Sequence, residues 1–129
     1  MQRNTEKSHP DENKALVLHG RKLMLDSHAA EVFGVSTAAV LQAVKENPAR
    51  FPKEFVVQLT KTECRKIAKT GGRLSHYIDP KRDSLAFTPS GFFMLSGILN
   101  SEQAVAISIT IIRALYASHS APRSQGEAG

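Results

Sequence analysis

Residues 26–47 read DSHAAEVFGVSTAAVLQAVKEN, and their spacing predicts two short helices joined by a tight turn. Ala30 stands four residues before Gly34, and a side chain this small lets the second helix pack closely against the first. Gly34 permits a sharp turn, because a side chain there would cost energy. Val40 follows six residues after Gly34, where an aliphatic side chain can fill the crossing of the two helices. This is the pattern of a helix-turn-helix.

Both predicted helices begin with residues that can cap them, and the second helix has one side that should face outward. Asp26 or Ser27 can cap the first helix and Ser36 the second, because each side-chain oxygen can accept a hydrogen bond from a backbone N–H. A helix-turn-helix normally lays its second helix in the major groove of DNA. Val40, Ala43 and Val44 lie at helical spacing and should face inward. The candidate groove residues are therefore Ser36, Thr37, Ala38, Leu41, Gln42 and Lys45.

Three of these side chains suit the recognition of bases. Leu41 can meet a thymine methyl group, Gln42 can make a bidentate contact to adenine, and Lys45 can reach guanine or a phosphate. The alternative interpretation is that Leu41 packs on the next segment and that Gln42 is only solvated.

Positive charge is concentrated just after the candidate reading helix. The chain has 17 lysines and arginines against 12 acids, a net charge of +5. Between Lys45 and Arg82, ten lysines and arginines face four acids, so this segment alone carries +6. A basic surface attracts phosphate backbones, although a solvated basic surface without a partner has the same composition. We expect phosphate contacts from Asn47, Arg50, Lys53 and Arg73.

The rest of the chain is predicted to form a small antiparallel sheet and a C-terminal helix pair. Apolar runs on both sides of Gly20 predict a β-hairpin. Thr60 and Glu63 form a capping box for a basic helix, and Thr88 followed by Pro89 marks another helix start. We expect strands at 15–18, 22–25, 55–59 and 84–87, helices at 61–69, 89–99 and 102–117, and a turn and polar loop at 70–83. The fold class is α+β.

The last predicted helix has a broad apolar side. Val105, Ile109, Ile112 and Tyr116 form one stripe at helical spacing, and further isoleucines lie beside it. We expect this stripe to belong to the core. A dimer interface is the alternative.

Length and composition predict a single domain, and the cysteine content predicts a reducing compartment. The 129 residues are enough for a core of their own. We expect a disordered segment at 1–13, a domain at 14–117 and a disordered tail at 118–129, because both ends are polar and lack periodicity. The polar N-terminus resembles no signal peptide, apolar runs are too short to cross a bilayer, and Cys64 is the one cysteine. These features predict a cytoplasmic protein without membrane contact.

The sequence shows no arrangement typical of catalysis or cofactor binding. The acids are scattered, and one cysteine with widely spaced histidines gives no zinc-finger spacing. Gly71 and Gly72 lack the rest of a phosphate-binding motif. We therefore expect no enzymatic activity, no cofactor and no metal. A metal-dependent nuclease centre at His76, Asp79 and Asp83 is a weaker alternative.

The pattern NxxRFPxxFxxxLT from Asn47 to Thr60 is the most specific feature of the chain. Together with Phe33-Gly34-Val35, Leu41 to Lys45 and Ala86-Phe87-Thr88, it resembles the ORF-six N-terminal domain of phage and prophage proteins, a relative of the KilA-N domain. The matching residues extend from Gly20 to Ala114. This chain departs from the family in an inserted polar stretch around residues 76–83.

The resemblance implies a DNA-binding domain of a phage regulator or antirepressor in a bacterial host cell. The expected partner is double-stranded DNA, and a phage or host regulatory protein and a second copy of the chain are further candidates. The alternative function is a protein-interaction module that sequesters a repressor without reading DNA.

Overall fold

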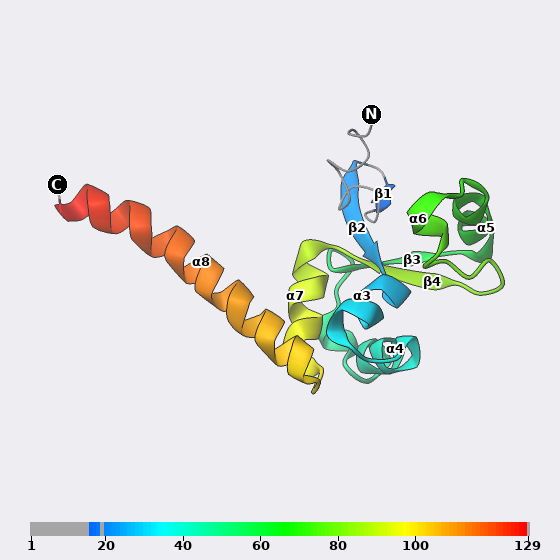
Figure 1. Ribbon diagram of the computed structural model, residues 1–129, viewed down its shortest axis with the longest axis horizontal. Helices are drawn as coiled ribbons and strands as arrows, with labels where there is room; N and C mark the ends of the chain where they lie inside the picture. The colour runs from blue at the N-terminus through cyan, green and yellow to red at the C-terminus, as the bar shows by residue number, and fades with distance from the viewer. Residues whose placement is uncertain (1–15, 19, 129) are drawn as a thin grey trace, which may run out of the picture.

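The centre of the fold is an antiparallel sheet whose strands come from three separate parts of the chain (Figure 1). The computed structural model describes residues 16–18 and 20–128, so the predicted disordered segment 1–13 lies outside it. The strands are β1 (Leu16–Leu18), β2 (Arg21–Leu25), β3 (Val56–Leu59) and β4 (Ser84–Phe87). Within the described residues the sheet order is β1-β2-β4-β3. The predicted hairpin and the predicted pairing of β3 with β4 are both confirmed.

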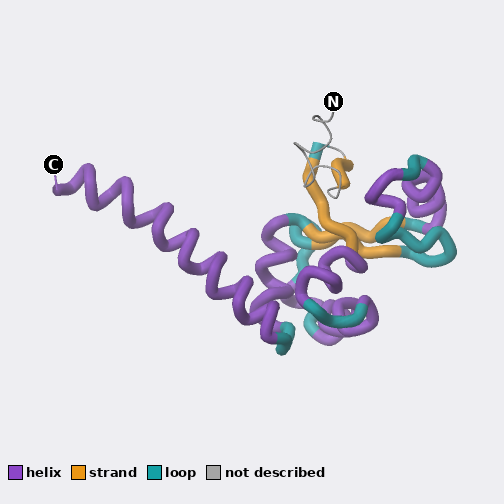
Figure 2. Tube along the Cα trace, viewed as in Figure 1, coloured by secondary structure: helices purple, strands orange, loops and turns teal. Residues whose placement is uncertain are grey.

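Helices account for most of the remaining chain and lie on both sides of the sheet (Figure 2). They are α3 (Asp26–Phe33), α4 (Thr37–Glu46), the 3-10 helix η1 (Pro48–Arg50), α5 (Lys61–Lys69), α6 (Gly72–Ser75), α7 (Pro89–Ile98) and α8 (Glu102–Ala128). The α+β class is confirmed. Helix and strand ends differ from the predictions by about one residue, apart from α6 and the end of α8.

Alternation along the strands explains why helices cover both faces. Side chains of a strand point alternately to opposite faces of the sheet. On β4, Phe87 packs into a core with α3, α4 and α7, whereas Ala86 packs into a second core with α5. On β2, Met24 belongs to the first core and Leu25 to the second. One sheet therefore separates two apolar clusters.

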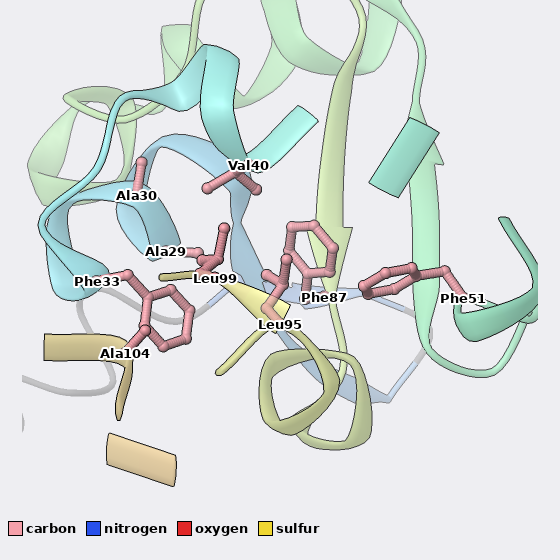
Figure 3. Close-up of a cluster of buried hydrophobic side chains, with 9 residues drawn as sticks. All are labelled: Ala29, Ala30, Phe33, Val40, Phe51, Phe87, Leu95, Leu99 and Ala104. Carbon is pink, nitrogen blue, oxygen red and sulfur yellow. The ribbon is translucent and has the colours of Figure 1, made fainter. Parts of the chain in front are cut away.

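The first core fixes the position of the α3–α4 pair. Phe33 and Val40 from this pair are fully buried and meet Phe87 of the sheet and Leu95 of α7 (Figure 3). Phe33 also stacks on Phe92 of α7, with ring centroids 4.7 Å apart. Burying a side chain of this size stabilises a fold by about 1.5–3 kcal/mol, so the pair is firmly held by its inner side.

The second core corrects the prediction of a turn and loop at 70–83. Residues 72–75 form the short helix α6, and Tyr77 and Ile78 are buried against Leu59 and Cys64. The sequence did not predict that these two residues are buried, because the stretch around them is polar and shows no apolar periodicity. Cys64 is fully buried, as expected of a core residue.

The last helix differs from the prediction in both length and environment. Instead of ending near residue 117, α8 continues to Ala128. Only its first turns pack on α7 and α3, and the rest extends away from the body (Figure 1). The expected core role of its apolar stripe is therefore wrong. Val105, Ile109, Ile112 and Tyr116 are 43–73% exposed.

Candidate nucleic-acid interface

The joint between α3 and α4 has the predicted geometry. Gly34 ends α3 with a φ of 69° in the left-handed region, where glycine is favoured. The N–H of Gly34 donates to the carbonyl of Glu31 at 3.2 Å, and that of Val35 donates to Ala30 at 3.0 Å. Ala30 and Val40 are buried where the two helices meet. The chain therefore turns sharply and presents α4 in one orientation.

Ser36 starts α4 as predicted. Its hydroxyl accepts a hydrogen bond from the N–H of Ala39 at 3.0 Å. The hydroxyl of Thr37 donates to that of Ser27 at 3.4 Å and joins the two helices at their polar edge. These contacts hold the first turn of α4, where a reading helix contacts bases.

The predicted groove residues lie on the outward side of α4. Ser36, Ala38, Gln42 and Lys45 are exposed, and Thr37 and Leu41 are half-buried. Among the described residues, Leu41 is not one of the side chains packed against the first core, whereas Ala43 and Val44 are. The amide nitrogen of Gln42 donates to the carboxylate of Glu46 at 2.6 Å. This bond orients Gln42 along the helix and places one negative charge beside it.

The segment after α4 holds two exposed cations next to the helix end. Phe51 is 7% exposed and lies edge-on to Phe87, with ring centroids 6.1 Å apart. This anchor leaves Arg50 and Lys53 at the surface on either side. Asn47 ends α4, because its Nδ2 donates to the carbonyl of Ala43 at 2.8 Å. The amide carries two hydrogens, so this bond leaves one for a phosphate.

Asp26 does not cap α3, which corrects the first capping prediction. Leu25 occupies the cap position without a side-chain hydrogen bond, and Asp26 is fully buried. Its carboxylate accepts two hydrogen bonds from Arg82, at 3.0 and 3.1 Å, and one from the N–H of Leu85 at 3.0 Å. Hydrogen bonding to this carboxylate raises the pKa of the Arg82 guanidinium. The inserted stretch is thereby tied to the start of α3.

The remaining basic residues are spread over more than one surface. On α5 the exposed cations are Lys61, Arg65, Lys66 and Lys69. Arg82 serves the buried pair with Asp26 and adds little to the surface charge. Arg73 lies on α6, and its side chain is outside the described part of the chain. Lys45, Arg50 and Lys53 lie on α4 and on the segment that directly follows it. The cations of α5 form a separate group on another element.

The three residues of the alternative nuclease centre each contact a different neighbour in the structure. In residues 16–18 and 20–128, no group of three histidine, cysteine, aspartate or glutamate side chains is arranged to hold a metal ion. His76 lies against Tyr77, Asp79 accepts a hydrogen bond from the N–H of Lys81, and Asp83 accepts one from Gln58.

No helix in the described part is both long and apolar enough to span a membrane.

The family model of the ORF6N domain matches residues 13–98. The chain belongs to the ORF6N family. This is a phage-related N-terminal domain, so the resemblance drawn from the sequence is confirmed. The matched range covers the sheet, the α3–α4 pair and α7, and α8 begins after it. Neither a curated protein nor a solved structure matches the chain.

Proposed function

We propose that this ORF6N domain is a sequence-specific binding domain for double-stranded DNA in a phage or prophage regulatory protein. The observation that carries the proposal is the outward side of α4, where Gln42 and Lys45 are exposed while Val40 holds the inner side in the core. An α-helix with its side chains is about 10–12 Å across, and the major groove is about 12 Å wide. The helix can therefore enter the groove without any rearrangement of the first core.

The chemistry of the α4 surface divides into base contacts and phosphate contacts. Gln42 suits the N6 and N7 edge of adenine, and Leu41 suits a thymine methyl group. Arg50, Lys53 and the second amide hydrogen of Asn47 would hold phosphates beside the helix end, and the exposure of both cations supports this assignment. Phosphate contacts fix the register of the domain on the duplex, and the base contacts select the sequence. This division requires no catalytic group, so the proposed function is not enzymatic.

Replacing both Gln42 and Lys45 with alanine should reduce affinity for a duplex selected from random DNA by about 10- to 100-fold. A bidentate base contact is worth about 1–3 kcal/mol, and each 1.4 kcal/mol is tenfold in affinity. Both side chains are exposed, so the variant should keep the thermal stability of the wild type. Fluorescence anisotropy with a labelled duplex measures the change.

Lys22→Ala is the matched control, because it removes one exposed positive charge from β2 and leaves α4 unchanged. Its affinity should stay within about twofold of the wild type. If the double variant and K22A lost the same amount of affinity, binding would depend on total charge alone and would not involve base contacts from α4.

The second candidate function is sequestration of a repressor by a protein-interaction surface. The exposed apolar residues of α8 favour it, because large exposed apolar patches mark interaction sites. Under this function the Gln42 and Lys45 variant would bind its protein partner normally, and the wild type would not select a sequence from random DNA.

A further inference from the structure

The apolar face of α8 is the largest feature that the proposed function does not use. We define it as Val105, Ile109, Ile112, Leu115 and Tyr116, whose side chains are 49%, 43%, 54%, 46% and 73% exposed. Five large hydrophobic side chains exposed on one helix lose favourable burial, and such a patch on a soluble domain marks an interaction site. The body of this chain does not cover the face.

The spacing of the apolar face is that of a coiled coil. Val105, Ile109, Ile112 and Tyr116 are separated by four, three and four residues, which is the alternation of a heptad repeat. This spacing places all four side chains in one line along the helix and suits a second helix packed nearly parallel to it. A helix on a globular body has the same spacing, so the identity of the partner depends on the charge and the area of the face.

Charge on α8 allows an identical helix to approach. From residue 102 to residue 117 the charged side chains are Glu102, at the first turn, and Arg113. Two copies therefore bring almost no like charge together, whereas a strongly charged partner helix would find nothing to pair with. A face that is apolar and regular along its whole length can pair with itself about a two-fold axis.

The area of the face is sufficient for a weak dimer. Pairing two copies through these five side chains would bury on the order of 1,000 Å² in total, which is the lower limit for a specific interface. Beyond its first turns α8 projects from the body, which leaves room beside the helix for a second helix (Figure 1). We propose that the apolar face of α8 binds the same face of a second copy of this chain and forms a homodimer.

The start of α8 connects this interface to the α3–α4 pair. The hydroxyl of Ser101 donates to the carbonyl of Phe33 at 2.5 Å, at the end of α3. The Gln103 side chain lies directly over Gly34, so that a Cβ at Gly34 would be 2.6 Å from it. Ala104 is fully buried in the first core. Dimerisation through α8 would therefore fix the orientation of the two α4 helices relative to each other.

Sedimentation equilibrium of the full chain without DNA tests the proposal independently of DNA binding. The wild type should show a monomer–dimer equilibrium between about 1 and 200 µM, as expected for an interface near the lower size limit. The double variant Ile109→Glu with Ile112→Glu should be monomeric over this whole range, because it would place four carboxylates in the dimer interface.

Thr110→Glu with Ala114→Glu is the control, because it adds the same charge at two exposed positions on the other side of α8. This variant should dimerise as the wild type does. Ile112→Ala is a milder variant that should raise the dimer dissociation constant about tenfold, and it keeps the test open if the glutamate variants unfold. A wild type that is monomeric at 200 µM, or a dimer that both glutamate variants weaken equally, would overturn the proposal.

Discussion

Replacing Asp26 with alanine should destabilise the domain by about 3–5 kcal/mol, which is the usual cost of breaking a buried ion pair. Asp26 is fully buried, and its carboxylate accepts hydrogen bonds from Arg82, from the N–H of Leu85 and from the N–H of Ser27. Its removal leaves the partly buried guanidinium and a backbone donor of β4 without this acceptor. A typical domain has only about 5–15 kcal/mol of stability in total, so the effect should be large.

Urea unfolding followed by circular dichroism measures this loss. Arg82→Ala should have a comparable effect, because it leaves the buried carboxylate of Asp26 without its cation. The double variant should lose less than the sum of the two single variants, since both remove the same interaction. Lys81→Ala is the control at a neighbouring exposed cation and should change stability by less than about 0.5 kcal/mol. Equal stability of D26A and K81A would contradict the role of the pair.

Gly91→Ala should also destabilise the domain strongly, by about 2–3 kcal/mol or more. Gly91 is buried on α7, and a Cβ there would lie 2.0 Å from the carbonyl oxygen of Phe55. That oxygen cannot retreat easily, because it accepts hydrogen bonds from the N–H and the hydroxyl of Thr88. The helix and the strand entrance would therefore have to move apart.

Gly97→Ala provides a matched control within the same helix. A Cβ at Gly97 would meet no atom within 4 Å, and the residue is exposed. Alanine is favoured over glycine inside a helix by about 1 kcal/mol, so this variant should be slightly more stable than the wild type. Thermal unfolding of both variants gives the comparison. If G91A were as stable as G97A, the close approach of α7 to Phe55 would be refuted.

Local patterns in the sequence were sufficient to predict the parts of the fold that depend on near neighbours. Thr60 and Glu63 form both hydrogen bonds of the predicted capping box, and Ser36 caps α4 as expected. Gly34 takes the left-handed conformation that its place in the turn predicts. Each of these depends on residues within about one helical turn of each other, so spacing alone identifies them.

The errors came from residues whose partners are distant or absent. Asp26 has the position of a helix cap, but its partner Arg82 is 56 residues away, and no local pattern links the two. Tyr77 and Ile78 enter the second core from a polar stretch without periodicity. For α8, the period of the stripe shows that one side is apolar but does not show what covers it. On α4, the exposure of Gln42 and Lys45 was predictable, because it follows from the burial of Val40 on the opposite side of the helix.

A salt titration with random duplex DNA is the most direct test of the proposal that this domain binds DNA. Three phosphate contacts from the cations Lys45, Arg50 and Lys53 should give a slope of log affinity against log salt of about −3. Affinity should then fall by about fiftyfold between roughly 50 and 200 mM salt. Absence of binding even at the lowest salt concentration, or binding that does not change with salt, would contradict the proposal.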